Sequence, residues 1–373
     1  MFKAIYHKAP QDEIQAMFTK FETKGLSKFW IYNNWEVFIS KYEYAKDFLS
    51  ESAEALPKWS LPDKHPTRKF LGDGLSFSNG QKWITHRRIA NPAFNRALSP
   101  EVVGKITIDL INLLDKIVDQ PFDIFKVMQR TTIQVLGKVA FNYDFKCLEN
   151  LEAQHEVIET YVKIIDFLGD PLLYVVPWLH KFQRKSKAEF ENDLEMFNYN
   201  MLKIIQNRRE EIKKSKLSNN DDNDKDSTLR NDLLYGMIEA ANEENYEMSS
   251  DDLRDEMVTF FLAGHDTREE AISVLGVKGK IPTSEDLKVV IYKSLRLYPA
   301  LVETLPRLTK KELRYGQMII PKNTMASVNI WAVHRDPQSW PDPEKFNPER
   351  FLSSKGDNNL HAWMPFSAGP RNW

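Results

Sequence analysis

The sequence contains a short polar stretch, AGHDT at residues 263–267, that follows a strongly apolar segment predicted to be helical. Gly264 would let a planar ligand approach the helix closely, because glycine has no side chain. The Thr267 hydroxyl can bond a carbonyl one turn back and open the helix, and Asp266 and Thr267 could together relay protons. Taken alone, the stretch is equally typical of a polar helix end, so both interpretations stay open at this point.

Three further stretches carry side chains suited to a buried site. SLRLYP at 294–299 predicts a helix that ends at a proline, FNPERF at 346–351 places Arg350 among aromatic residues, and FSAGPRN spans 366–372. Taken alone, the first is common at helix ends and the second at surface turns. The sequence has no HExxH, GxSxG, P-loop or GxGxxG pattern, so hydrolase, kinase and dinucleotide-binding functions have no motif to support them.

Taken together and in this order, the four stretches resemble the cytochrome P450 family of haem-thiolate monooxygenases. The resemblance covers almost the whole chain, because WITHRRIANPAF at 83–94 is similar to the family's WxxxR helix, and HRDP at 334–337 and Trp340 follow in the expected order. It implies an oxidoreductase that inserts one oxygen atom of O2 into a small apolar substrate. It also implies an NADPH-dependent reductase as electron donor and, for full-length eukaryotic relatives, a location at the endoplasmic reticulum membrane.

The resemblance also implies a haem site and assigns residues to it. The two haem propionates need charge-assisted donors in fixed geometry, for which arginine is favoured. By resemblance these donors are Trp83, Arg87, Arg307 and Arg371, while Asp266 and Thr267, with Gly264, would lie on the dioxygen face and manage its protonation. On the opposite face, a cysteine thiolate would bind the iron.

The residue expected at the thiolate position is absent. The family pattern is FxxGxRxC, in which Phe366, Gly369 and Arg371 match and the cysteine position is Trp373. An indole offers only an N–H donor and no metal ligand, and the single cysteine of the chain, Cys147, is predicted to be structural. We therefore expect no axial ligand, and interpret the final stretch as a haem-ligand loop cut at its ligand.

A second departure concerns a buried ion network. The family has a glutamate three residues before the arginine of its ExxR helix, and that glutamate pairs with this arginine and with the arginine of the PERF-like stretch. Here the position is Lys293, so Lys293, Arg296 and Arg350 would bring three cations together. Removing the acidic partner of a buried ion network typically costs ~3–5 kcal/mol.

A third departure is a shortening between Thr267 and Arg296, where the second half of the oxygen-face helix and the helices after it are expected to be missing. DLKVVIY at 286–292 suggests a second, smaller loss. These departures leave two hypotheses open. The chain is either a haem-dependent monooxygenase with impaired activity, or a non-catalytic, haem-free descendant that binds a lipid-like ligand or a partner protein.

The predicted fold is mainly α with a small β region: one domain over 1–373, P450-like and haem-enclosing, incomplete at the C-terminus. Glycine is scarce and apolar residues recur at helical spacing, as in Asp193–Lys214. Two strands, Phe29–Tyr32 and Trp35–Ser40, are predicted to join at Asn33-Asn34, followed by a helix over Tyr42–Ser50.

Later segments complete the predicted elements. The polar run Ser215–Thr228 predicts a disordered surface loop. Ser249 and Asp252 have capping-box spacing, which predicts a helix start. From Leu313 to Val333 the pattern is β-like, with turn residues at Gly316-Gln317.

Composition narrows the function classes further. Lysine and arginine number 51 against 53 acidic residues, for a net charge of −2, and this balance argues against a nucleic-acid partner. One cysteine allows no disulfide within the chain. No apolar run approaches the ~20 residues of a membrane span, so we expect this chain to be cytoplasmic or peripheral, without the anchor usual in eukaryotic relatives.

Overall fold

We describe the protein from a computed structural model. Contacts divide the chain into two compact units, which are described separately below. The first unit comprises residues 1–60, 170–183 and 269–373, and the second comprises 61–169 and 184–268. The prediction of a single domain stays a prediction. The structure describes residues 24–31, 34–97, 100–117, 122–149, 156–170, 173, 184–218, 232–266, 295–297, 299, 301–345 and 362–371.

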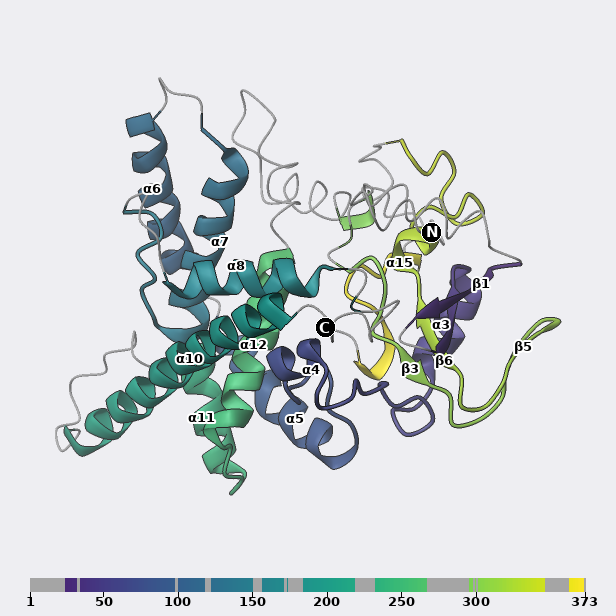
Figure 1. The fold of residues 1–373 in the computed structure, drawn as a ribbon, viewed down its shortest axis with the longest axis horizontal. Helices are drawn as coiled ribbons and strands as arrows, with labels where there is room; N and C mark the ends of the chain where they lie inside the picture. The colour runs from purple at the N-terminus through teal and green to yellow at the C-terminus, as the bar shows by residue number, and fades with distance from the viewer. Residues whose placement is uncertain are drawn as a thin grey trace. The chain divides into compact units, whose positions relative to one another are not determined.

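The second unit is helical in every element that the structure describes (Figure 1). Helix α5 packs against α11, α10 packs against α8 and α12, and α6 packs against α7. The helices are α4 (Pro66–Leu71), α5 (Gly80–Ala97), α6 (Pro100–Ile117), α7 (Ile124–Phe141), α8 (Glu156–Leu168), α10 (Arg184–Ser218), α11 (Leu233–Glu243) and α12 (Ser250–Asp266).

Aromatic side chains form the centre of this unit. The Phe261 ring of α12 lies 5.2 Å from the Tyr161 ring and 5.8 Å from the Phe145 ring, measured between centroids. Such contacts add to the burial of apolar area that stabilises the unit. The close approach of α7 to Phe145 requires glycine at 137, because a Cβ there would lie 2.4 Å from the Phe145 ring. Other rings of the cluster are Phe70, Phe141 and Phe197.

Helix α10 corrects one predicted boundary. The apolar stripe predicted over Asp193–Lys214 is helical and buried, but the helix extends from Arg184 to Ser218. Residues 215–218, assigned to the predicted loop, therefore belong to the helix. They include neither glycine nor proline, so nothing local stops the helix before Ser218. The remainder of the predicted loop lies outside the described residues.

The start of α12 confirms the predicted capping box. The Asp252 amide donates to Ser249 Oγ at 3.0 Å, and the Ser249 amide donates to Asp252 Oδ2 at 3.2 Å. These two bonds satisfy backbone donors that a helix start leaves without a partner.

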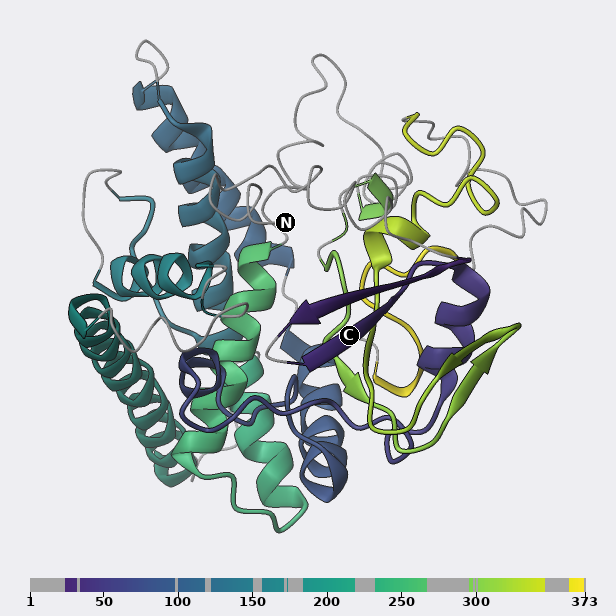
Figure 2. The same cartoon turned by 45° about the vertical axis from the view of Figure 1, so that its right-hand side comes forward.

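The first unit contains the sheets. One has the strand order β1-β2-β6-β3, in which β2 and β6 run parallel and the other neighbours run antiparallel, and β4 pairs with β5 in a separate hairpin (Figure 2). The elements are β1 (Leu26–Ile31), β2 (Asn34–Ile39), α3 (Tyr42–Ser50), β3 (Arg307–Leu308), β4 (Leu313–Tyr315), β5 (Met318–Ile320), β6 (Met325–Val328), α15 (Ile330–Val333) and the 3-10 turn η5 (Gly369–Arg371).

Helix α3 has the predicted bounds, whereas two other predictions in this unit need correction. Asn34 is not a turn residue but the first residue of β2, paired with Ile31. Residues Ile330–Val333, predicted as strand, form a helical turn. The Asn329 side chain causes this change, because its Oδ1 accepts the Ala332 amide at 3.0 Å and so caps the turn. Gly316, with φ +60°, lies at the predicted turn between β4 and β5.

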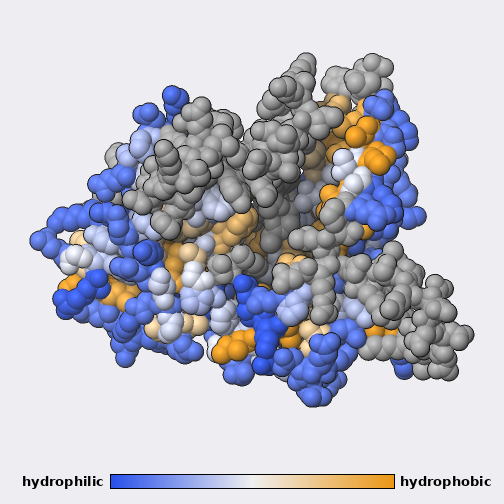
Figure 3. Space-filling model, turned by 180° about the vertical axis from the view of Figure 1, so that it is seen from behind, coloured by the Kyte–Doolittle hydropathy of each residue, from blue (hydrophilic) through white to orange (hydrophobic). Residues whose placement is uncertain are grey.

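The core of this unit lies between the sheet and α3. Its members include Phe48 from α3, Ile39 from β2 and Val328 from β6, all fully buried. On the face seen in Figure 3, hydrophilic residues cover most of the coloured surface and hydrophobic ones appear as separate patches. Among the helices that the structure describes, none is both long enough and apolar enough to cross a membrane.

Candidate functional site

The structure holds Arg307 in place through the backbone on both sides. Its strand, β3, pairs with β6, where Arg307 lies opposite Ala326. On the other side, the Leu308 amide donates to Pro57 O at 2.8 Å and the Trp59 amide donates to Pro306 O at 2.8 Å. The side chain is 3% exposed, and its guanidinium lies 5.6 Å from the centre of the Phe48 ring.

A second buried guanidinium, Arg371 of η5, lies within electrostatic reach of Arg307. Burial, and then the charge of Arg371, lower the pKa of Arg307 to about 10. Burial lowers the pKa of Arg371 to about 10, while the nearby Glu54 carboxylate acts in the opposite direction. Two buried cations that repel each other gain most from a shared anionic partner. The assignment of this pair to the carboxylates of a haem stays a prediction.

Gly369 has a packing role that can be stated independently of any ligand. Its φ is +75°, and a Cβ at this position would lie 2.0 Å from the Leu49 carbonyl oxygen. No other residue can take this conformation so close to α3. Gly369 thus allows the η5 turn, and with it Arg371, to pack against the end of α3.

Phe366 belongs to a turn just before η5. Its ring is half-buried, and the Ser367 amide closes the turn by donating to Met364 O at 2.9 Å. Phe366, Gly369 and Arg371, predicted from one motif, are thus presented by one short segment of the first unit.

Arg296 lies in a helical turn over 295–297 and is fully buried. It donates to the carbonyl oxygens of His334 at 2.8 Å and Pro343 at 2.7 Å, and its guanidinium lies 5.3 Å from the centre of the Trp340 ring. The other two members of the predicted three-cation cluster, Lys293 and Arg350, lie outside the described residues. Their part in the network stays a prediction.

Trp83 and Arg87 lie in the second unit, one turn apart on α5 and both half-buried. This i, i+4 spacing places them on one side of the helix, as two donors for one ligand edge require. Burial lowers the pKa of Arg87. The helix predicted from the WxxxR resemblance is confirmed.

A buried acid–base network joins α5 to α12 within the second unit. The His86 Nδ1 lies 2.7 Å from Glu256 Oε1, with both side chains at most 1% exposed. The other oxygen of Glu256 accepts the Leu75 amide at 3.1 Å. Nearer the surface, Lys82 pairs with Asp252 at 2.8 Å. Sequence reasoning missed this network, because a lone histidine and a helix carboxylate give no motif.

The oxygen-face residues are only partly described. Gly264 and Asp266 lie in the last turn of α12, whose backbone is helical to Asp266. Thr267 lies outside the described residues, as does Trp373 at the expected ligand position. Their chemical roles stay predictions.

Cys147 cannot serve as a ready thiolate. It is 2% exposed, and burial raises the pKa of its thiol to about 12. Its amide donates to Gln134 Oε1 at 3.0 Å, as expected of a structural position. Within the described part of the chain, no group of three or more His, Cys, Asp or Glu side chains could hold a metal ion.

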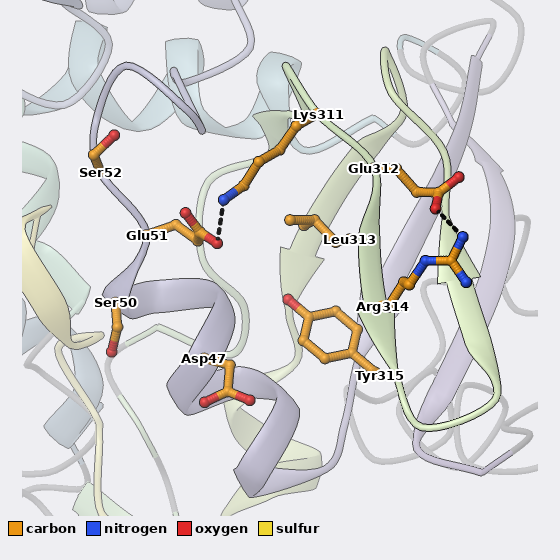
Figure 4. A pocket seen from close by; sticks show the side chains of 9 residues that line it. All are labelled: Asp47, Ser50, Glu51, Ser52, Lys311, Glu312, Leu313, Arg314 and Tyr315. Atoms are coloured by element: carbon orange, nitrogen blue, oxygen red, sulfur yellow. Dashed lines mark ion pairs between the residues drawn. The ribbon is translucent and has the colours of Figure 1, made fainter.

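One pocket of about 510 Å³ lies in the first unit between α3 and the β4–β5 hairpin (Figure 4). Two ion pairs line it, Lys311–Glu51 at 2.8 Å and Arg314–Glu312 at 2.6 Å. Burial, together with Asp47 and Glu51, raises the pKa of the Tyr315 hydroxyl there. The lining is polar and includes none of the predicted site residues.

Comparison with known proteins gives concordant results. The family model described as Cytochrome P450 matches residues 2–275 and 285–372. Cytochrome P450 4c21 of Blattella germanica is 31% identical over 81% of this chain and 67% of its own length. Cytochrome P450 4F5 of Rattus norvegicus is 27% identical over 82% of this chain and 65% of its own length. The chain thus spans about two thirds of the length of these relatives.

A solved structure supports the same fold. The crystal structure of the cytochrome P450DA heme domain superposes with a TM-score of 0.73, covering 99% of this chain and 84% of that one, at 17% identity. The predicted fold class, mainly α with a small β region and P450-like, is confirmed by this likeness. With the family model matching most of its length, the chain belongs to the cytochrome P450 family.

Proposed function

We propose that this protein contains the site of a haem-dependent monooxygenase. Such an enzyme is an oxidoreductase that inserts one oxygen atom of O2 into a small apolar substrate. Membership of the cytochrome P450 family supports monooxygenase chemistry at the level of the family. The observation that carries the proposal for this chain is the buried pair Arg307 and Arg371, whose pKa values are both lowered to about 10. Both groups remain charged near neutral pH, so a haem carboxylate would offset the repulsion between them.

The residues of the chain would divide the work. In the first unit, Arg307 and Arg371 would hold the propionates of the haem. The haem supplies oxygen activation when an axial thiolate binds it. Asp266 and Thr267 would carry protons to the oxygen face, and Gly264 would leave room for the flat ring. Phe366 and Gly369, from the same segment as Arg371, are also expected to contact the haem.

The partners follow from the family. We propose an NADPH-dependent reductase as electron donor, and association with the endoplasmic reticulum membrane for the full-length relatives. Buried apolar surface in the haem pocket would favour an apolar substrate.

The proposed binding of a haem carboxylate by Arg307 and Arg371 is tested by titrating the 373-residue chain with haem. Replacing both Arg307 and Arg371 by glutamine should weaken haem binding at least about 100-fold, since two charge-assisted bonds are lost. The matched control is Arg314→Gln, which removes an exposed arginine of the same unit and should leave binding unchanged. Equal affinity of the double variant and the control would overturn the site. Absence of binding by the unmodified chain would favour the haem-free alternative.

We further propose that this chain lacks thiolate ligation. Trp373 stands at the family's cysteine position, and the buried Cys147, with a thiol pKa of about 12, is a poor substitute. The purified chain should therefore not give the thiolate-type carbon monoxide difference spectrum. Observation of that band with the chain alone would contradict the proposal, and its persistence in a Cys147→Ala variant would exclude Cys147 as its source.

A repair experiment separates the ligand from the shortening between Thr267 and Arg296. Replacing Trp373 by Cys should give haem incorporation with negligible substrate oxidation, because the inferred deletion would leave the haem open to water. Filling the 267–290 gap as well should restore product formation. Efficient turnover by the repaired but still shortened chain would show that the deletion is tolerated.

A further inference from the structure

The imidazole of His334 is fully buried, and both of its ring nitrogens have partners. The Met364 amide donates to Nε2 at 2.8 Å, and Nδ1 lies 3.1 Å from the Arg296 carbonyl oxygen. A backbone amide can only donate, so Nε2 carries no proton. The proton of the neutral ring is therefore on Nδ1, from which it is donated to the carbonyl of Arg296.

The surroundings keep this ring neutral. Burial is the main cause that lowers the pKa of His334, to about 3, and the charges of Arg296 and Arg335 act in the same direction. A doubly protonated ring would lose the acceptor that Nε2 offers to Met364. The neutral His334 ring and its hydrogen bonds are thus consistent with one tautomer, in which the proton is on Nδ1.

His334 joins three segments that are far apart in the sequence. Arg296 returns a bond to the His334 carbonyl at 2.8 Å, and Arg335 donates to the Leu297 carbonyl at 2.6 Å. Met364 is the first residue of the turn that carries Phe366, and its side chain is buried in the core of the first unit. The imidazole therefore bridges the Arg296 turn and the start of the loop.

We propose that His334 is a positioning residue, which fixes the start of the loop 364–371 to the Arg296 helical turn through the bond from the Met364 amide to Nε2. The loop carries Phe366, Gly369 and Arg371. The restraint on the loop is a property of the chain without haem, whereas its consequence for haem rests on the proposed function.

Two substitutions test the bond because they imitate different nitrogens. Glutamine at 334 can place an oxygen near Nε2 and accept from the Met364 amide, whereas asparagine reaches only the position of Nδ1. In hydrogen exchange of the haem-free chain, the Met364 amide should exchange at least about tenfold faster in His334→Asn, and within about threefold of the unmodified rate in His334→Gln. Equal exchange rates in the two variants would overturn the proposal.

A control separates this bond from general loosening of the region. Asn329→Ala removes the cap of the neighbouring turn α15 and leaves the imidazole bond in place. Its effect on the Met364 amide should be small compared with that of His334→Asn. An equal effect would show that the bond has no specific role.

The unmodified chain provides a second test that needs no variant to fold. Long-range nitrogen NMR of the imidazole should report a proton on Nδ1 and none on Nε2. A ring protonated on Nε2 would overturn the proposal. Both measurements use the haem-free chain, so failure of haem to bind would contradict the proposed function without affecting either result.

Discussion

The two units of the protein give several of their buried ionisable groups different partners. In the second unit, two buried carboxyl groups each have a side-chain partner. Glu256 lies 2.7 Å from the His86 imidazole, and Asp232 pairs with Arg208 where both side chains are 3% exposed. In the first unit, Arg296 donates to main-chain carbonyls. A carboxyl of the same unit, Glu36 on β2, is 2% exposed, and burial followed by the charge of Glu303 raises its pKa to about 8.

This difference concerns the surroundings of buried arginines in the two units. A buried pair that is neutral as a whole needs no ligand, although breaking it leaves an uncompensated charge. The first unit instead places Arg307 near Arg371, and burial lowers the pKa of both guanidinium groups. The four predictions below test this comparison, from the largest expected effect to the smallest.

Breaking the internal pair of the second unit should have the largest effect. Glu256→Ala leaves both His86 and the Leu75 amide without their acceptor. We expect a loss of about 3–5 kcal/mol in the free energy of unfolding, as for other buried pairs that lose one partner. Urea unfolding measures this loss. A loss below about 1 kcal/mol would mean that the pair does not hold α5 to α12.

The protonated carboxyl of the first unit should give a smaller effect that depends on pH. Because the pKa of Glu36 is raised to about 8, its contribution is fully present below the unfolded value of 4.5 and is lost as pH rises through 8. Glu36→Gln cannot ionise, so relative to the unmodified chain it should gain roughly 3 kcal/mol between pH 5 and pH 9. The control is Glu312→Gln, which changes a half-exposed carboxylate. Parallel pH profiles for Glu36→Gln and the unmodified chain would contradict this expectation.

Adding an anion to the first unit should stabilise it. We expect Lys293→Glu to gain of order 1–3 kcal/mol, because by the family resemblance it would restore a carboxylate between Arg296 and Arg350. Thermal unfolding measures the gain, and Lys293→Gln shows how much of it comes only from removing a cation. An unchanged or lower midpoint for Lys293→Glu would mean that the three residues are not packed together.

An exposed pair should have the smallest effect. Arg88 and Glu244 lie 2.8 Å apart in the second unit, with side chains 57% and 37% exposed. Arg88→Ala should cost less than about 1 kcal/mol, and the cost should fall in high salt, because water and ions screen the pair. A loss of unfolding free energy close to that of Glu256→Ala would show that burial does not determine the size of these effects.

The sequence by itself determined the elements whose signals are local. Apolar spacing predicted the buried stripe of α10, side-chain chemistry predicted the Ser249–Asp252 cap, and the bounds of α3 were predicted correctly. The ordered motifs determined the family, because each motif carries its own residue types and spacing. Local signals also set the limit of prediction: the β-like run ending at Val333 gave no indication that Asn329 would cap a helical turn instead.

Only the tertiary structure decided which distant residues share an environment. The charge of Arg371 contributes to the lowered pKa of Arg307 because folding buries both in one unit. Met364 reaches His334 because the chain returns to the Arg296 turn. Burial and electrostatic coupling depend on atoms far apart in the sequence, so no motif contains them. The motif accounts for the glycine at 369, but only the folded chain gives the physical reason, a Leu49 carbonyl where a Cβ would otherwise lie.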